Sequence, residues 1–181
     1  MAHALAKPFD IIMRSYVESA DREGETMIDN KRQQLVDNIR IAIAQHNDET
    51  NVLRTAVELI DAFSEDFNWT GFYLMRADTL EVGPYVGPET QHVRIGLDRG
   101  ICGAAALQRQ SIIVDDVQAD PRFLACSAAT RSEIVVPLID GETVLGEIDI
   151  DSDRPAKFTM HDKQMLEEIA HVVVARLKQI R

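Results

Sequence analysis

The hydrophobic period of this chain changes near Asn68, and this change limits the folds that the chain can adopt. Before that point, apolar residues recur every three or four positions, which predicts helices over residues 9–64 with a break at 46–50. Residues 69–75 and 80–86 then follow the pattern of two strands joined by a hairpin loop. The chain therefore combines an N-terminal helical segment with a β-rich part.

The β-rich part contains further strands and two more helices. The remaining strands are predicted at residues 92–95, 112–114, 132–139 and 143–151. One helix is expected to begin near Cys102, and a buried stripe predicts another over residues 159–180. Residues 132–139 are apolar on both faces, as expected for a strand that helices cover on both sides. The predicted fold is α/β (α+β), with a mainly antiparallel central sheet flanked by helices on both faces.

The length of the chain, 181 residues, suits one domain with an added helical segment. We expect residues 67–181 to form the core of this domain. We expect residues 1–66 to form a helical segment that packs either on the core or on the partner in a homodimer.

The net charge of −11 opposes binding to nucleic-acid phosphates and to anionic lipid. No stretch approaches the ~18 consecutive apolar residues that a membrane span requires, and the N-terminus lacks the pattern of a signal peptide. These observations predict a cytoplasmic protein with neither nucleic acid nor membrane as a partner. In that compartment its two cysteines are expected to be thiols, although a transient disulfide remains open.

An alternating run of acids marks the last predicted strand. Glu147, Asp149 and Asp151 are two residues apart and therefore share one face of the strand. Their mutual repulsion is tolerated where the face is solvated, binds a metal, or receives a cationic ligand. For an arbitrary strand the solvated face is the more common outcome.

The two cysteines precede these acids in the C-terminal half of the chain. Cys102 stands at the start of a predicted helix, where unpaired amide N–H groups favour a thiolate, but a cysteine without further context is more often a small core residue. Cys126 lies in a predicted loop of small residues, a setting in which functional residues are frequent.

A metal site and an aromatic wall are two further possibilities. His92, Cys102 and Cys126, together with a carboxylate, would offer suitable ligands for zinc or copper, although their spacing is not that of a known metal motif. Trp69, the only tryptophan, is either a core residue or one wall of a site for a small amphipathic ligand.

Short motifs follow one another in a fixed order between Asn68 and Ser152. They are residues 68–74, 80–84, 93–95, 99–103, 115–117, 124–126, 131–138 and 146–152. In this order they resemble the GAF domains that act as free methionine-(R)-sulfoxide reductases, and the resemblance covers roughly two-thirds of the chain.

This resemblance implies a role for each of the reactive residues. Cys126 would be the nucleophile that attacks the sulfoxide, and Cys102 would be an auxiliary thiol. The ligand would be bound by Trp69, Glu133, Asp149 and Asp151. The expected reaction needs no bound cofactor, because a cysteine sulfenic acid forms and thioredoxin or another external thiol reduces it. The alternative is a GAF module that binds free methionine sulfoxide or a similar amino-acid-like ligand without turnover.

The sequence departs from the family pattern at three places. His92 stands where the family usually has a third, resolving cysteine, so recycling must use Cys102 or an external thiol. Glu147 replaces a residue that is usually apolar. The segment 1–66 lacks the aromatic and asparagine-rich stretch that usually completes the pocket.

The turn of the last hairpin decides whether the acids share one pocket. A regular two-residue turn at Asp140 and Gly141 would pair Glu133 with Ile148 and direct Glu133 away from Asp149. A common pocket therefore predicts a longer loop or a β-bulge in this hairpin.

Overall fold

A six-stranded sheet forms the centre of the molecule, and the computed structural model describes residues 8–124, 127 and 129–181, with side chains from residue 26 onward. The strands lie in the order β3-β2-β1-β6-β5-β4, and each neighbouring pair is antiparallel. Their bounds are β1 Trp69–Arg76, β2 Thr79–Val86, β3 Arg94–Gly96, β4 Ile112–Val114, β5 Ser132–Asp140 and β6 Thr143–Ser152. The prediction of a mainly antiparallel sheet is confirmed.

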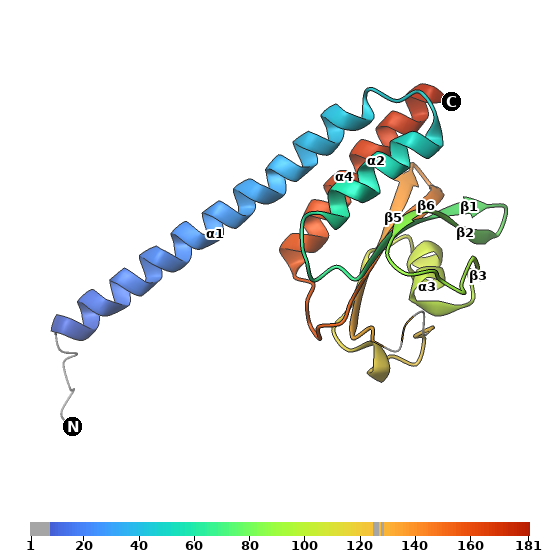
Figure 1. Cartoon of the computed structure of the whole chain (residues 1–181). Helices are drawn as coiled ribbons and strands as arrows, with labels where there is room; N and C mark the ends of the chain where they lie inside the picture. Colours follow the sequence, from blue (N-terminus) through green and yellow to red (C-terminus); the bar gives the residue numbers. More distant parts are fainter. Residues whose placement is uncertain (1–7, 125–126, 128) are drawn as a thin grey trace.

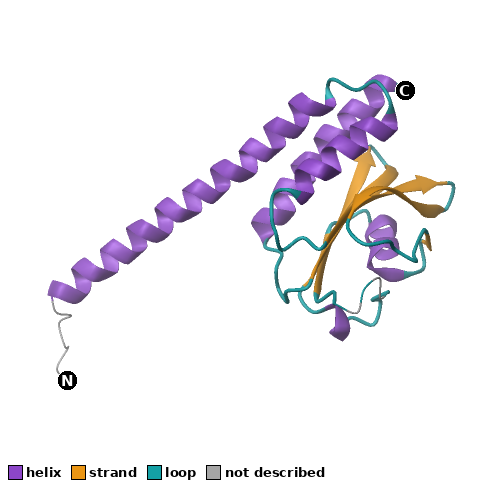
Figure 2. Cartoon of the chain, in the orientation of Figure 1, coloured by secondary structure: helices purple, strands orange, loops and turns teal. Residues whose placement is uncertain are grey.

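Helices cover both faces of this sheet (Figure 1 and Figure 2). Their bounds are α1 Pro8–Ile43, α2 Glu49–Asp61, α3 Gly100–Gln108 and α4 Met160–Ile180, with a short 3-10 helix η1 at Val117–Ala119. Helices α1, α2 and α4 lie on one face and α3 lies on the other, while the N-terminal part of α1 extends away from the sheet (Figure 1). No helix in the described ranges is long and apolar enough to cross a membrane.

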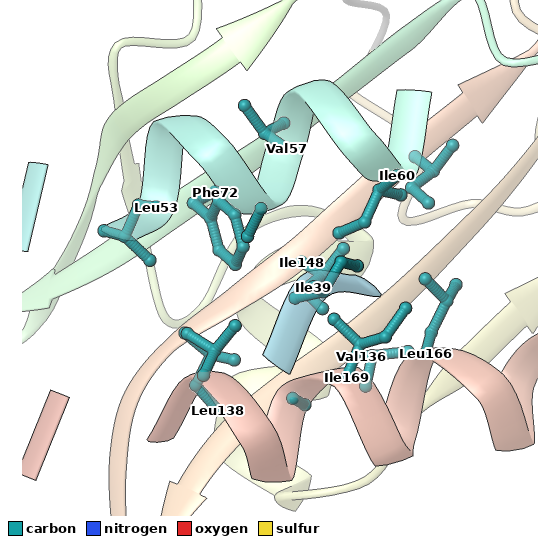
Figure 3. Packing of buried hydrophobic residues seen from close by; sticks show 14 of the residues in the cluster. Ile39, Leu53, Val57, Ile60, Phe72, Val136, Leu138, Ile148, Leu166 and Ile169 are labelled. Atoms are coloured by element: carbon teal, nitrogen blue, oxygen red, sulfur yellow. The ribbon is translucent and has the colours of Figure 1, made fainter. Parts of the chain in front are cut away.

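The larger hydrophobic core lies between the sheet and helices α1, α2 and α4. Ile39, Ile60 and Ile169 are fully buried there, one from each helix, and they meet apolar side chains of the sheet (Figure 3). Each such side chain contributes about 1.5–3 kcal/mol when it leaves water. An ion pair of 3.1 Å between Arg32 and Asp162 adds a polar link between α1 and α4.

The smaller core lies between the sheet and α3. The helix approaches the chain before it closely at Gly103, where a Cβ atom would lie 2.7 Å from the carbonyl oxygen of Gly96. Small side chains such as Ala105 let the rest of α3 pack against Tyr73 and Val135 of the sheet. The small residues of α3 therefore bring this helix close to the sheet.

The β5–β6 hairpin contains the irregularity that the common pocket requires. Its turn falls at residues 141–142, because Asp140 pairs with Thr143. A register shift follows: Ile139 pairs with Val144 but Leu138 pairs with Gly146, so Leu145 is an extra residue. Without this β-bulge, the register of the turn would bring Glu133 opposite Ile150.

The bulge instead places Glu133 opposite Asp151, on the same face of the sheet as the acids of β6. Gly146 makes this possible, since its φ of +157° is one that L side chains rarely adopt. A Cβ atom at this position would also lie 2.2 Å from the carbonyl oxygen of Tyr73.

We expect Gly146→Ala to destabilise the protein by about 3–4 kcal/mol, because it combines an unfavourable φ with a backbone clash. The matched control is Gly141→Ala, where φ is +60° but nothing lies within 4 Å, so only about 1–2 kcal/mol is expected. Urea unfolding of both variants measures the difference. Equal losses would contradict the role given to the bulge.

Candidate functional site

Four acids and one thiol meet between the sheet and α3. Strand β6 provides Glu147, Asp149 and Asp151, and the bulged hairpin adds Glu133 from β5. Helix α3 provides Cys102, whose Sγ lies 3.4 Å from Oδ2 of Asp149. The structure thus brings together five residues that the sequence singled out.

The acid face of β6 is buried, which is not the usual outcome for an alternating acidic strand. The exposed fractions are 0% for Glu147, 4% for Asp149, 5% for Asp151 and 6% for Glu133. Helix α3 and the aromatic residues of β1 and β2 cover this face and exclude water from it.

Burial changes the proton affinity of all four acids. It raises the pKa of Asp149 to about 7, although the hydrogen bond from Cys102 opposes the rise. It also raises the pKa values of Glu133, Glu147 and Asp151 well above their usual range, and in each case the nearby charge of Asp149 adds to the effect. Burial therefore favours the protonated, proton-donating form of each of these acids.

The same environment disfavours a thiolate at Cys102. Burial raises the pKa of the thiol well above its ordinary value, and the charges of Asp149 and Glu147 raise it further. The expectation that the start of α3 would favour a thiolate is therefore wrong for this residue. Desolvation and the neighbouring acids outweigh the effect of the helix N-terminus.

Several buried polar atoms in this region have no hydrogen-bond partner among the described residues. They are both carboxyl oxygens of Glu147, Oδ1 of Asp149 and Nε1 of Trp69. Glu147 is near enough for its charge to act on Cys102, but its oxygens make no hydrogen bond of normal geometry. Unpaired buried groups cost free energy, so they indicate a place where a ligand completes the bonding.

Trp69 forms one wall of the site. Its ring stacks on Tyr85 with centroids 5.4 Å apart and lies 5.9 Å from the ring of Tyr73. Gly71 makes room for the indole, because a Cβ atom there would lie 2.3 Å from it. Trp69 is thus both a core residue, 7% exposed, and a pocket residue.

A pocket of about 220 Å³ opens beside Asp151, one of the four acids. It is lined by Asn68, Trp69, Pro88, Glu89, Thr90, Ser127, Ala129, Thr130, Asp151 and Asp153. The alternation of side chains along strand β2 could have identified Tyr85, which stacks on Trp69. The loop residues Thr90 and Thr130 follow no periodic pattern, so the sequence analysis did not identify them.

Cys126, the predicted nucleophile, lies outside the described residues. The predicted metal set of His92, Cys102 and Cys126 includes it and stays a prediction. In the described part of the chain, ligand atoms of Cys102, Glu133 and Asp149 lie within 4.8 Å of one another and could hold a metal ion. The backbone of His92 is held by Tyr73, whose hydroxyl donates to its carbonyl oxygen over 2.9 Å.

Comparisons with known proteins agree with this architecture. Residues 35–177 match the family model of the GAF domain. The chain is 41% identical to the free methionine-R-sulfoxide reductase of Escherichia coli (strain K12) over 115 residues, which is 64% of this chain and 67% of that protein. It is 43% identical to the free methionine-R-sulfoxide reductase of Saccharomyces cerevisiae over 114 residues, 60% of this chain and 62% of that protein.

A solved structure extends the similarity to the fold. The free methionine-R-sulfoxide reductase from Neisseria meningitidis, in complex with its substrate, superposes with a TM-score of 0.78 at 32% identity. The match covers 81% of this chain and 88% of that one.

We expect Glu147→Gln to reduce the loss of stability at high pH. Between the ordinary pKa of glutamate and its raised value here, the folded state keeps a proton that the unfolded state has released, so stability falls as pH rises. Melting temperatures should be measured in the presence of a chelator from about pH 5 to about pH 8, and they should fall less with pH in the variant than in the unchanged protein. Each 1 kcal/mol of lost unfolding free energy lowers the melting temperature by about 2–4 °C.

The control for this measurement is Glu142→Gln, which changes an exposed glutamate of the same hairpin. Its melting temperatures should follow those of the unchanged protein across the pH range. Parallel curves for Glu147→Gln and Glu142→Gln would show that Glu147 does not carry the predicted proton.

Proposed function

The chain belongs to the GAF domain family, and on this premise we propose that it is an oxidoreductase that reduces free L-methionine-(R)-sulfoxide to methionine through a cysteine thiol. The observation that carries the proposal is the buried cluster of Glu133, Asp149 and Asp151 beside Trp69 and a thiol. Such a pocket combines proton donors, sites for a cation and an apolar wall.

The substrate has a group for each part of this pocket. Its ammonium group is a cation, so its binding would draw at least one of the buried acids into the carboxylate form. Its sulfoxide oxygen accepts hydrogen bonds, which protonated acids such as Asp149 can donate. Its methyl group and side chain suit the aromatic wall at Trp69, whose indole N–H has no acceptor among the described residues and is a further donor.

Cys126 is the proposed nucleophile. Its sulfur attacks the sulfoxide sulfur while an acid of the pocket supplies a proton to the oxygen. In net terms the oxygen passes to Cys126, so the thiol is oxidised to a sulfenic acid and the sulfoxide is reduced to the thioether. Two described residues near Cys126 in the sequence support this role. Leu124 packs on the α3 core, and Ser127 lines the pocket.

Cys102 is the proposed resolving thiol. Its sulfur bonds to that of Cys126 and water leaves, formed from the sulfenic hydroxyl and the thiol proton. Thioredoxin or another external dithiol then reduces the disulfide. Because its pKa is raised, Cys102 needs a base for this step, and the Asp149 carboxylate 3.4 Å away is suitably placed.

A second candidate function is ligand binding without turnover. It is favoured by His92, which stands in place of a cysteine, and by the raised pKa of Cys102, which slows thiol chemistry. The same pocket would then bind free methionine sulfoxide or a similar amino acid as a signal.

An assay that couples thioredoxin, thioredoxin reductase and NADPH separates the two functions. We expect NADPH consumption with the R epimer of free methionine sulfoxide and much less with the S epimer. Cys126→Ser should abolish methionine formation, because it removes the sulfur that is proposed to accept the oxygen. Cys102→Ser should still form about one methionine per protein but lose thioredoxin-dependent turnover.

The contradicting outcomes are distinct. Binding of the sulfoxide without any methionine formation would support the sensor function. Full turnover in Cys102→Ser would remove the resolving role from Cys102 and leave recycling to an external thiol alone.

We also propose that the chain forms a homodimer through α1. Met27 and Ile28 expose 57% and 45% of their surface on the part of this helix that precedes its contacts with the core. A second copy that packs on this part would remove them from water.

Light scattering should give a dimer mass, and the double change of Met27 and Ile28 to lysine should give a monomer. A monomer before the change would contradict the proposal.

A further inference from the structure

We propose that Cys102, Glu133 and Asp149 form a binding site for a divalent cation of borderline softness, with Zn²⁺ as the best fit, and that this cation competes with the amino-acid ligand. The metal site itself does not depend on the proposed reductase activity, whereas the competition assumes the proposed ligand pocket. The site differs from the metal set predicted from the sequence, because two carboxylates take the places of His92 and Cys126.

The distances fit a tetrahedral zinc ion. The Sγ atom of Cys102 and Oδ2 of Asp149 lie 3.4 Å apart. A thiolate and a carboxylate on one zinc ion, at about 2.3 and 2.0 Å from the metal, lie about 3.5 Å from each other. A carboxyl oxygen of Glu133 lies within 4.8 Å of the Cys102 sulfur and of a carboxyl oxygen of Asp149, so a small movement of one side chain completes a three-ligand set.

The ligands come from three separate elements that the core holds in place. Cys102 belongs to α3, Glu133 to β5 and Asp149 to β6, and all three are buried. Sites on packed helices and strands are more precise than sites on loops. The mixture of one sulfur and two oxygen ligands favours zinc over magnesium or calcium, which prefer oxygen alone.

No described side chain forms an ion pair with the three acids nearest to Cys102. Among the side chains that the structure describes, Glu133, Glu147 and Asp149 take part in no ion pair. The charge of Glu133 acts on Arg122, but Asp120 already holds that guanidinium through hydrogen bonds of 2.9 and 2.6 Å. A bound cation would supply the missing positive charge.

Unpaired buried oxygens provide an independent indication of a ligand. Oδ1 of Asp149 and both carboxyl oxygens of Glu147 are buried and have no hydrogen-bond partner in the described part of the chain. Glu147 shares the face of Asp149 on β6 and acts electrostatically on Cys102. Its oxygens can therefore receive a hydrogen bond from a water on the metal.

The proposed route of the cation to the cluster is the pocket that Asp151 lines. Asp151 lines the pocket of about 220 Å³ and stands opposite Glu133 in the hairpin register. An ammonium group held by the same acids would occupy the place of the metal. Zinc and the amino-acid ligand therefore exclude each other.

Cobalt(II) titration of the reduced, metal-free full-length protein tests the site, because a thiolate bound to cobalt gives an ultraviolet charge-transfer band. We expect one cobalt ion per chain, such a band, and displacement of cobalt by Zn²⁺. Cys102→Ser should lose the band, and Asp149→Asn should weaken cobalt binding at least about tenfold. Cys126→Ser should keep both the band and the affinity.

Circular dichroism of each variant shows whether it is folded, and Glu142→Gln serves as an acid-removal control that should bind cobalt normally. Loss of the band in Cys126→Ser with its retention in Cys102→Ser would overturn the site, as would the absence of saturable binding. Free methionine sulfoxide should raise the apparent Kd for cobalt, and an unchanged Kd would overturn the competition. The titration requires no turnover, so its failure is distinguishable from a failure of the reductase proposal.

Discussion

Four carboxyl side chains and a thiol share the water-excluded space between the sheet and α3, and the rest of the site follows from their burial. Charges in such a space are stable only when a proton, a cation or a hydrogen-bond donor compensates for the lost water. The raised pKa values of Glu133, Glu147, Asp149 and Asp151 are the consequence when protons alone compensate.

This constraint connects the proposed chemistry to the proposed metal site. The buried acids have lost the hydrogen bonds and the charge screening that water would give them. A substrate ammonium group, a sulfoxide oxygen and a divalent cation each replace a different part of that lost stabilisation. The ammonium group and the metal need carboxylates, whereas the sulfoxide oxygen needs a protonated acid. Asp149 suits either demand, because burial brings its pKa to about 7 and both forms are accessible near neutral pH. The state of this one residue therefore follows the occupant of the pocket.

The sequence predicted the parts of the structure that local patterns encode. Period-two alternation placed Glu147, Asp149 and Asp151 on one face of β6, and the helical period found α2 and α4. The burial of that face was not readable, because it depends on α3 and Trp69 from distant parts of the chain. For the same reason the helix-start argument failed for Cys102, whose pKa is governed by its tertiary neighbours. The loop residues of the pocket had no period to reveal them.

The bulge at Leu145 gives the site an unusual dependence on chain length. Side chains alternate between the two faces of a strand, so the face on which a side chain lies depends on whether the number of residues between it and the turn is odd or even. Removal of one residue from β6 at the bulge would exchange the neighbours of Glu133, from Asp151 to Ile150, without altering a single acid. Chains of this kind can therefore gain or lose the pocket through a one-residue insertion or deletion, a change that comparison of the acidic positions alone would overlook.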